Sequence, residues 1–327
     1  MIVTLRAGAD PAPVAAALQG LGLWTQALQG VDGITSALAV LPCSAAVPAE
    51  RLRDLPGVAD VLASPSAHPL VDAQAREVQV GPVTLGGAPI LAAGPCAVES
   101  EEGIHEVAAL VAASGARLLR GGAFKPRTSP YSFRGHGREA LRWLRSAADA
   151  HRLGVVTEAL SEADAAAVAE VADLIQIGSR NMQSYALLRA VGRTGRPVLL
   201  KRGMAATVEE WLLAGEHLLE AGARAVIFCE RGVHGGDPST RNLLDLGAVA
   251  LLAHVHRQTV VVDPSHAVGR RDLIRPLARA ALAAGAAGVL VEVHPRAAEA
   301  RSDGPQALSP DELAAIGRDV TGAGVWP

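Results

Sequence analysis

Residues 118–133 read Leu-Leu-Arg-Gly-Gly-Ala-Phe-Lys-Pro-Arg-Thr-Ser-Pro-Tyr-Ser-Phe. The apolar run that opens this stretch predicts a strand, which ends at Arg120, and the glycine pair that follows lets the backbone turn closely. Donors suited to phosphate and carboxylate oxygens then come in quick succession, between two prolines that restrict the loop. These donors are Lys125, Arg127, Thr128 and Ser129. The stretch therefore predicts a strand that delivers an anion-binding loop.

The same unit, an apolar strand followed by an amphipathic helix, repeats from Pro89 onward. Eight such units over about 240 residues predict a closed (β/α)8 TIM barrel. A doubly wound open sheet is the alternative, but the glycine-rich G-x-G-x-x-G that it favours after its first strand is absent. The expected strands are Ile90–Ala93, Arg117–Leu119, Val155–Thr157, Leu174–Ile177, Val198–Leu200, Ala225–Phe228, Thr259–Val262 and Gly288–Val291.

Nearly every expected strand is followed by a polar residue of a type used in catalysis. In a barrel these positions converge on the carboxyl-terminal face, where active sites lie. A single charge at a strand end is usually only the first solvated position, but coincidence across eight strands is much less common. The residues are Cys96, Arg120, Glu158, Gln176 to Arg180, Lys201, Glu230 with Arg231, Asp263 with His266, and Glu292.

The cationic members of this set predict a ligand that carries several negative charges. Six positive groups in one cup would repel one another, and two phosphates with a carboxylate supply roughly five negative charges at neutral pH. The six are Arg120, Lys125, Arg127, Arg180, Lys201 and Arg231.

A second group has the composition of a metal site: Cys96, His266, Glu292 and Asp303. A thiolate, an imidazole and two carboxylates suit a divalent transition ion better than magnesium or calcium. Their spacing is too wide for a local metal motif, so a small buried cysteine and a turn carboxylate remain the alternative interpretations of Cys96 and Asp303.

The first 65 residues have a different pattern, in the order strand, helix, strand, strand, helix, strand. This order predicts a small α+β domain of ferredoxin-like type, which contains few groups suited to catalysis and is expected to have a regulatory role. We therefore expect a regulatory domain at 1–65, a linker and β-hairpin at 66–88, and a catalytic barrel at 89–327.

Composition sets further limits on the chain of 327 residues. Its formal net charge of −3 argues against nucleic-acid or membrane-surface binding. The three cysteines lie far apart, as expected in a reducing cytoplasm. No signal-peptide pattern and no apolar run long enough to span a bilayer is present, so a soluble, cytoplasmic protein is expected.

Several motifs, in this order, resemble 3-deoxy-D-arabino-heptulosonate 7-phosphate (DAHP) synthases over residues 75 to 315. The small first domain resembles the regulated, short-chain branch of that family. The motifs are residues 94–100 (GPCAVES), 125–129 (KPRTS), 177–183 (IGSRNMQ), 200–203 (LKRG), 229–232 (CERG), 263–266 (DPSH), 291–295 (VEVHP) and 302–304 (SDG).

The resemblance implies the first step of aromatic amino-acid biosynthesis, the shikimate pathway: phosphoenolpyruvate and erythrose 4-phosphate condense with release of phosphate. It implies that Arg180, Lys201 and Arg231 hold the phosphate of phosphoenolpyruvate. Arg120 and Lys125 would address its carboxylate end. The implied ligands for erythrose 4-phosphate are Arg127, Thr128 and Ser129.

By the same resemblance, Cys96, His266, Glu292 and Asp303 would bind Mn²⁺, Fe²⁺, Co²⁺ or Zn²⁺. Lys125 would be a proton donor or an electrostatic partner, so that Lys125, Cys96 and His266 are the expected catalytic residues. An aromatic amino-acid effector at the first domain and a homo-oligomer, dimer or tetramer, are also implied.

Two alternatives remain. A 3-deoxy-manno-octulosonate 8-phosphate synthase has the same barrel and chemistry, but its loop typically reads Lys-Ala-Asn where this chain has Lys125-Pro126-Arg127. A non-catalytic barrel that senses phosphorylated metabolites would need no metal set. One departure from the family pattern is the loose segment 233–238 after Arg231.

Overall fold

The computed structural model describes residues 1–30, 33–63, 65–125, 131 and 133–322. The chain divides into two compact units, Met1–Ala67 and His68–Pro327, and each is described by itself. In the part of the chain that is described, no helix has both the length and the apolar character needed to cross a membrane.

The first unit is a four-stranded antiparallel sheet with two helices. Its elements are β1 (Ile2–Leu5), α1 (Pro11–Gly20), β2 (Thr25–Gln29), β3 (Thr35–Val40), α2 (Ala49–Arg53) and β4 (Val58–Leu62). The strand order β2-β3-β1-β4 is that of the expected ferredoxin-like split β-α-β unit. Asp10 begins α1 by accepting a hydrogen bond from the Ala12 backbone, and Val14 and Leu18 bury the inner face of this helix.

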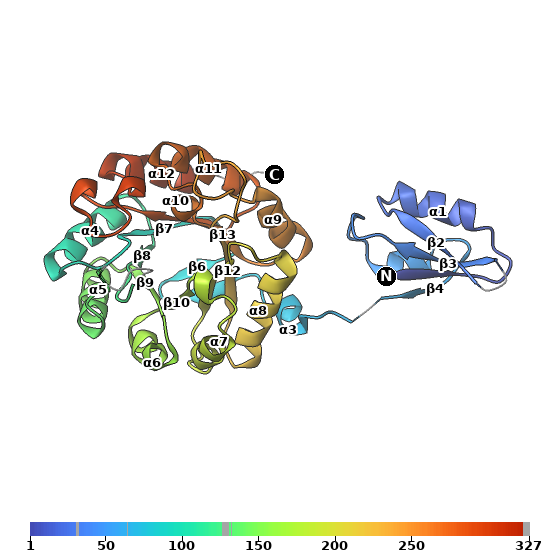
Figure 1. Ribbon diagram of the computed structural model, residues 1–327, viewed down its shortest axis with the longest axis horizontal. Coiled ribbons are helices and arrows are strands. Elements are labelled where there is room, and N and C mark those ends of the chain that lie inside the picture. The colour runs from blue at the N-terminus through green and yellow to red at the C-terminus, as the bar shows by residue number, and fades with distance from the viewer. Residues whose placement is uncertain (31–32, 64, 126–130, 132, 323–327) are drawn as a thin grey trace. The chain divides into compact units, whose positions relative to one another are not determined.

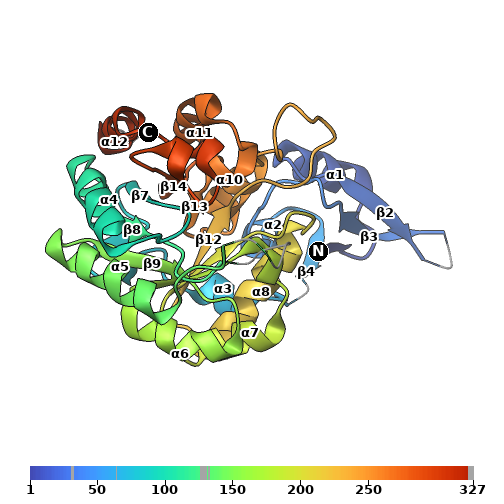
Figure 2. The ribbon, with the colours of Figure 1, turned by 60° about the vertical axis from the view of Figure 1, so that its left-hand side comes forward.

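The second unit is a closed barrel of eight parallel strands surrounded by helices (Figure 1; Figure 2), which confirms the predicted fold class. The strands are β7 (Ile90–Gly94), β8 (Leu118–Arg120), β9 (Gly154–Glu158), β10 (Leu174–Ile177), β11 (Val198–Lys201), β12 (Val226–Glu230), β13 (Val260–Val262) and β14 (Gly288–Glu292). The helices are α4 (Glu101–Ala113), α5 (Arg138–Ala150), α6 (Glu162–Val171), α7 (Tyr185–Gly192), α8 (Val208–Glu220), α9 (Leu246–Ala250), α10 (Pro264–Val268), α11 (Arg271–Ala283) and α12 (Pro310–Gly322).

Strand β12 illustrates how the barrel strands separate two apolar cores. Its alternate residues Val226 and Phe228 belong to the core between strands and helices, whereas Ile227 and Cys229 belong to the core inside the barrel. Side chains alternate in this way along any strand, so a continuous apolar run serves both faces and leaves the polar residue for the strand end.

The segment 66–88, expected to be a linker and a hairpin, also contains a helix, α3 (Pro69–Ala73). The helix packs against α8 in the second unit. The expected hairpin is present as β5 (Val78–Val80) and β6 (Val83–Leu85), and its apolar side chains join the core inside the barrel. The hairpin therefore forms part of the barrel unit.

Candidate active site

Buried charged residues end five strands of the barrel, and two of these residues are Glu158 at the end of β9 and Glu230 at the end of β12. Arg120, Lys201 and Glu292 are the last residues of β8, β11 and β14, and each side chain is nearly inaccessible to solvent. Because all eight strands are parallel, their carboxyl ends meet at one face, and that face gathers these groups at a single site.

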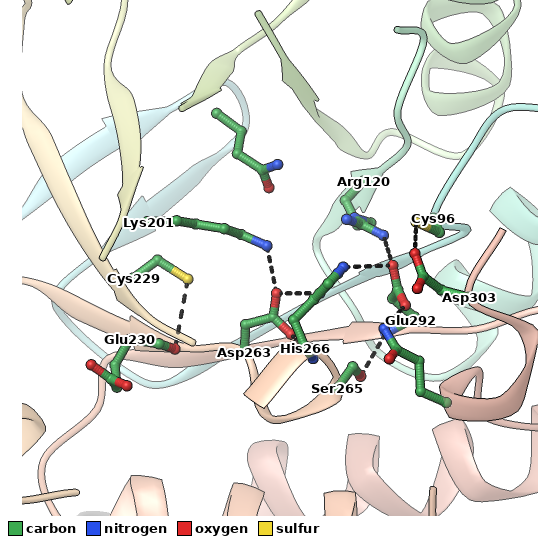
Figure 3. Close-up of polar contacts among 12 residues, drawn as sticks. Cys96, Arg120, Lys201, Cys229, Glu230, Asp263, Ser265, His266, Glu292 and Asp303 are labelled. Atoms are coloured by element: carbon green, nitrogen blue, oxygen red, sulfur yellow. Dashed lines mark hydrogen bonds and ion pairs between the residues drawn. The ribbon is translucent and has the colours of Figure 1, made fainter. Parts of the chain in front are cut away.

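Four side chains at this face could hold a metal ion. The ligand atoms of Cys96, His266, Glu292 and Asp303 all lie within 4.8 Å of one another. The Cys96 Sγ is 2.8 Å from Asp303 Oδ2, and His266 Nε2 is 3.2 Å from Glu292 Oε1 (Figure 3). Residues separated by up to 207 positions thus converge on one point, as the sequence analysis expected.

The orientation of His266 is set by the segment that carries it. Asp263 begins α10, and its Oδ1 accepts a hydrogen bond from the His266 backbone amide, while its Oδ2 lies 2.8 Å from His266 Nδ1. An Nδ1 proton donated to this carboxylate leaves Nε2 as the metal-facing atom. Lys201 also donates to Asp263 Oδ2, at 2.5 Å. Burial alone would raise the pKa of Asp263, but the neighbouring charges of His266 and Lys201 hold it well below its usual value.

Glu292 is held ionised by its neighbours. Arg120 donates from Nη1 to Glu292 Oε1 at 2.6 Å, and the Gln306 amide donates to Oε2 at 2.5 Å. Burial opposes ionisation, but the charges of His266 and Arg120 outweigh it and lower the pKa of Glu292. Both oxygens of this carboxylate are therefore fixed before any ion binds.

The Cys96 thiol lies among polar neighbours in a buried position. Lys125 Nζ is 2.8 Å from its sulfur and 2.9 Å from its carbonyl oxygen, and the Ser302 hydroxyl donates to the sulfur at 3.2 Å. Burial, and then the charge of Glu292, raise the pKa of Cys96 to about 12, so the thiol is neutral without a metal. Gly122 is required beside it, because a Cβ there would lie 2.7 Å from the Cys96 carbonyl oxygen.

Asp303 differs from Cys96 in the direction of its pKa shift. Burial would raise its pKa, but the hydrogen bond from Cys96 and the charges of His266 and Lys125 lower it to about 2. A preformed carboxylate next to a thiol that a cation can deprotonate is a suitable donor pair for a transition ion. Together with the His266 imidazole and Glu292, the donor set fits such an ion.

Arg231 is the residue that most clearly indicates an anion-binding position. Its side chain is buried, and among the described residues nothing accepts a hydrogen bond from its Nη1. Burial and the nearby charge of Arg241 both lower the pKa of Arg231, against the attraction of Asp263. A buried guanidinium nitrogen without an acceptor costs free energy that a bound anion would recover.

The other expected substrate-binding residues differ in their surroundings. Arg180 is exposed on the short helix η1 (Ser179–Asn181), which follows β10. Arg120 and Lys201 are paired with the buried carboxylates described above. The expected residues Arg127, Thr128 and Ser129 lie outside the described residues.

Sequence reasoning missed the residues that fix this site. Gln306 and Arg241 had been given no role, yet Arg241 Nη1 lies 3.3 Å from Gln306 Oε1 and 3.7 Å from Asp303 Oδ1. Both residues lie outside the eight strands, where no periodicity indicates which way a side chain points. Asp263 did carry a signal, since an aspartate before proline commonly begins a helix and thereby fixes His266 three residues later.

Comparison with known proteins agrees with this geometry. The model of the DAHP synthetase I family matches residues 73–323. The chain belongs to this family. Its match spans the barrel, including every metal-ligand candidate.

Individual relatives support the assignment. A phospho-2-dehydro-3-deoxyheptonate aldolase of Thermotoga maritima is 50% identical over 232 residues, 71% of this chain and 69% of the relative. A crystal structure of a DAHP synthase from the same organism aligns with 98% of this chain and 96% of its own, at 38% identity and a TM-score of 0.76. A 2-dehydro-3-deoxyphosphooctonate aldolase of Acidithiobacillus ferrooxidans is 34% identical over 242 residues, covering 66% of this chain and 83% of the relative.

Proposed function

We propose that this chain is a DAHP synthase, which condenses phosphoenolpyruvate with erythrose 4-phosphate and releases phosphate. The observation that carries the proposal is the joint presence, at one mouth of the barrel, of a four-ligand cluster and of the buried Arg231 Nη1, which has no hydrogen-bond partner among the described residues. The 50% identity to the Thermotoga maritima enzyme supports the same activity, at higher identity than the octulosonate relatives reach.

Binding of phosphoenolpyruvate is assigned to the cations around Asp263. Arg231 and Lys201 would hold its phosphate in the buried part of the mouth, and Arg180 would close over it from the exposed rim. Arg120 and Lys125 would address the carboxylate, and Arg127, Thr128 and Ser129 would receive the phosphate of the sugar. Guanidinium groups suit both oxyanions because they donate two parallel hydrogen bonds.

The condensation joins carbon 3 of phosphoenolpyruvate to the aldehyde carbon of the sugar. Positive charge then develops at the carbon that bears phosphate, water adds there, and the resulting hemiketal expels inorganic phosphate. Lys125 lies beside the ligand cluster, and we assign it the delivery of a proton to the aldehyde oxygen. Holding two polyanions in the correct orientation contributes on the order of 7 kcal/mol or more to such a reaction.

A divalent transition ion is the proposed cofactor, held by Cys96, His266, Glu292 and Asp303. When bound, such an ion supplies Lewis-acid polarisation of the sugar aldehyde. The protein contributes the rest of the arrangement: Asp263 selects the His266 tautomer, and Arg120 with Gln306 fixes Glu292. The mixed sulfur, nitrogen and oxygen set favours Mn²⁺, Fe²⁺, Co²⁺ or Zn²⁺ over magnesium.

The first unit is proposed to regulate the barrel. Its sheet and two helices carry no cluster of catalytic groups among the described residues, as expected of a module that binds an effector. An aromatic amino acid is the proposed effector, because it is the end product of the pathway. A cytoplasmic homo-oligomer, dimer or tetramer, completes the proposal.

A phosphate-release assay tests the proposed activity. The full chain, freed of metal and then supplied with Mn²⁺, should release phosphate from phosphoenolpyruvate only when erythrose 4-phosphate is also present. A parallel reaction with a five-carbon sugar phosphate should be much slower. Faster turnover of the five-carbon substrate would indicate an octulosonate synthase, and no turnover of either would leave the barrel as a sensor.

A further inference from the structure

A second group of metal-ligating side chains lies beside α8 and shares no residue with the active site. His68, Asp72 and His256 each offer a ligand atom, and these atoms lie within 4.8 Å of one another. His68 Nδ1 is 3.0 Å from Asp72 Oδ1, and the two imidazole rings are 5.7 Å apart between centroids, in an edge-to-face arrangement. None of the three has a part in the proposed reaction.

Two separate segments of the barrel unit bring these residues together. His68 precedes the first residue of α3 and Asp72 lies four residues later, so the two side chains project from the same face of the helix. His256 directly follows the π-helix η2 (Leu251–Val255). Helix α3 packs against α8, as Figure 1 shows, and His68 is almost completely buried there.

The backbone beside the cluster is held in place by hydrogen bonds to side chains. The Gln258 side-chain amide donates to the carbonyl oxygen of Val71 at 2.9 Å and to that of His256 at 2.8 Å. One buried amide thus connects the two ligand-bearing segments. On the other side of α3, the Glu216 carboxylate accepts hydrogen bonds from the Leu70 and Val71 amides, both at 2.9 Å.

A second carboxylate lies near the cluster but is not among the residues whose ligand atoms lie close together. Glu209 Oε2 lies 3.8 Å from His68 Nε2. The carboxylates of Asp72 and Glu209 are both largely exposed, whereas His68 is not. The cluster therefore has a buried imidazole, that of His68, on its inner side and the exposed carboxylate of Asp72 on the solvent side, through which an ion could enter.

We propose that His68, Asp72 and His256 form a second site for a divalent transition ion such as Zn²⁺. Two imidazoles with a carboxylate are a donor set for zinc, cobalt or nickel, whereas magnesium and calcium prefer oxygen alone. Ligands about 2.1 Å from one ion lie about 3.4 Å apart at the tetrahedral angle, which small side-chain rotations can achieve here.

We assign such an ion a structural role because of the two segments that it would connect. It would join α3 to the end of η2, two segments separated by more than 180 positions and otherwise linked through the Gln258 amide. His68 is also the first residue of the second unit, so the ion would fix the point at which the barrel unit begins. The other interpretation of the cluster is a set of ion pairs around protonated histidines.

Cobalt titration of the metal-free full chain distinguishes the two interpretations. The Cys96 site should give a thiolate-to-cobalt charge-transfer band in the near ultraviolet, while the second site lacks a thiolate and should give visible bands alone. We expect two Co²⁺ ions per chain. Asp72→Asn and His256→Gln should each lose the ion that has no charge-transfer band and keep the other.

The matched control is His254→Gln, which removes an imidazole two residues from His256 that is bonded to the Ala284 carbonyl oxygen. This variant should keep both ions, and Cys96→Ala should keep the second ion alone. The proposal is overturned if the wild-type chain binds a single ion with the charge-transfer band, or if Asp72→Asn binds two. Asp72 is exposed and asparagine has the same shape, so this variant should fold even if His256→Gln does not.

Discussion

Replacing Arg231 with methionine should weaken phosphoenolpyruvate binding while making the ligand-free protein more stable. The two effects have one cause, the buried Nη1 that lacks an acceptor among the described residues. In the ligand-free protein this nitrogen has lost its water without gaining a partner. In the complex it would donate to the substrate phosphate.

The size of the binding effect follows from the hydrogen bond that would be lost. A hydrogen bond to a charged group contributes about 1.5–3 kcal/mol, and each 1.4 kcal/mol corresponds to a factor of ten. We therefore expect Arg231→Met to raise the KM for phosphoenolpyruvate by about 10- to 150-fold. The KM for erythrose 4-phosphate should change little, because that substrate is assigned to other residues.

The stability effect should have the opposite sign. An unsatisfied buried polar group costs about 1–3 kcal/mol, and Arg231 is also repelled by the nearby Arg241. The attraction of Asp263 for the guanidinium offsets part of this cost, so a gain of about 1 kcal/mol is a reasonable expectation. A gain of that size raises the Tm of a domain this large by about 2–4 °C.

Steady-state phosphate release and thermal unfolding of the ligand-free protein measure the two effects. Arg145→Met is the matched control. In the described part of the chain the buried Nε of Arg145 also has no partner, but its other nitrogens pair with Asp149 and Asp173. The control should leave KM unchanged and lower the Tm. If Arg231→Met left KM for phosphoenolpyruvate unchanged and lowered the Tm, Arg231 would be structural and the phosphate would bind elsewhere.

Four further predictions concern the metal site and the first unit. Since burial raises the pKa of Cys96 to about 12, metal binding at neutral pH should release the proton of this thiol, so a pH indicator should record one proton fewer per chain for Cys96→Ala than for the unaltered protein. The free energy of unfolding of the metal-free protein should also depend on this thiol. The contribution is complete below the ordinary pKa of 9.0 and is lost as the pH rises toward 12, because the unfolded chain ionises its cysteine at a lower pH than the folded protein does. Urea titrations at a series of pH values measure this loss. Asp263→Asn should lower metal affinity about 10- to 100-fold, while the exposed Asp272→Asn should not; equal affinities in a competition titration would refute the orienting role. Deleting residues 1–67 should preserve kcat but abolish inhibition by an aromatic amino acid, and a truncated enzyme that is still inhibited would contradict the regulatory assignment.

The sequence allowed the metal cluster to be predicted because of the geometry of parallel barrels. Residues that follow different strands meet at one face whatever their separation in the chain. The positions of the strand ends were therefore enough to predict that Cys96, His266 and Glu292 lie close together. Asp303 follows no strand directly; it was included for its carboxylate, and the motif at residues 302–304 agreed with that choice. Its left-handed backbone, with φ of 55°, turns its carboxylate toward Cys96 in a way that no periodicity indicates.

Other features depended on contacts that a sequence does not record. Helix α3 has five residues, too few for an apolar period, and its position comes from packing on α8 and hydrogen bonds from Glu216 and Gln258. The side chain of Arg241 reaches Gln306 from an irregular loop. Composition identifies such residues as polar, but the fold alone determines which polar group each one meets.

The sequence also overestimated how strongly the mouth of the barrel requires an anion. Counting six cations implied a large surplus of positive charge, yet Glu292 is paired with Arg120 and Asp263 with Lys201. The need for an anion is therefore local and arises at Arg231, whose Nη1 has no acceptor in the described part of the chain. A phosphate brings three acceptor oxygens to this position, so binding it completes the hydrogen bonding of the folded protein. The residue that lowers the stability of the ligand-free enzyme is for that reason the one that should contribute most to holding the substrate.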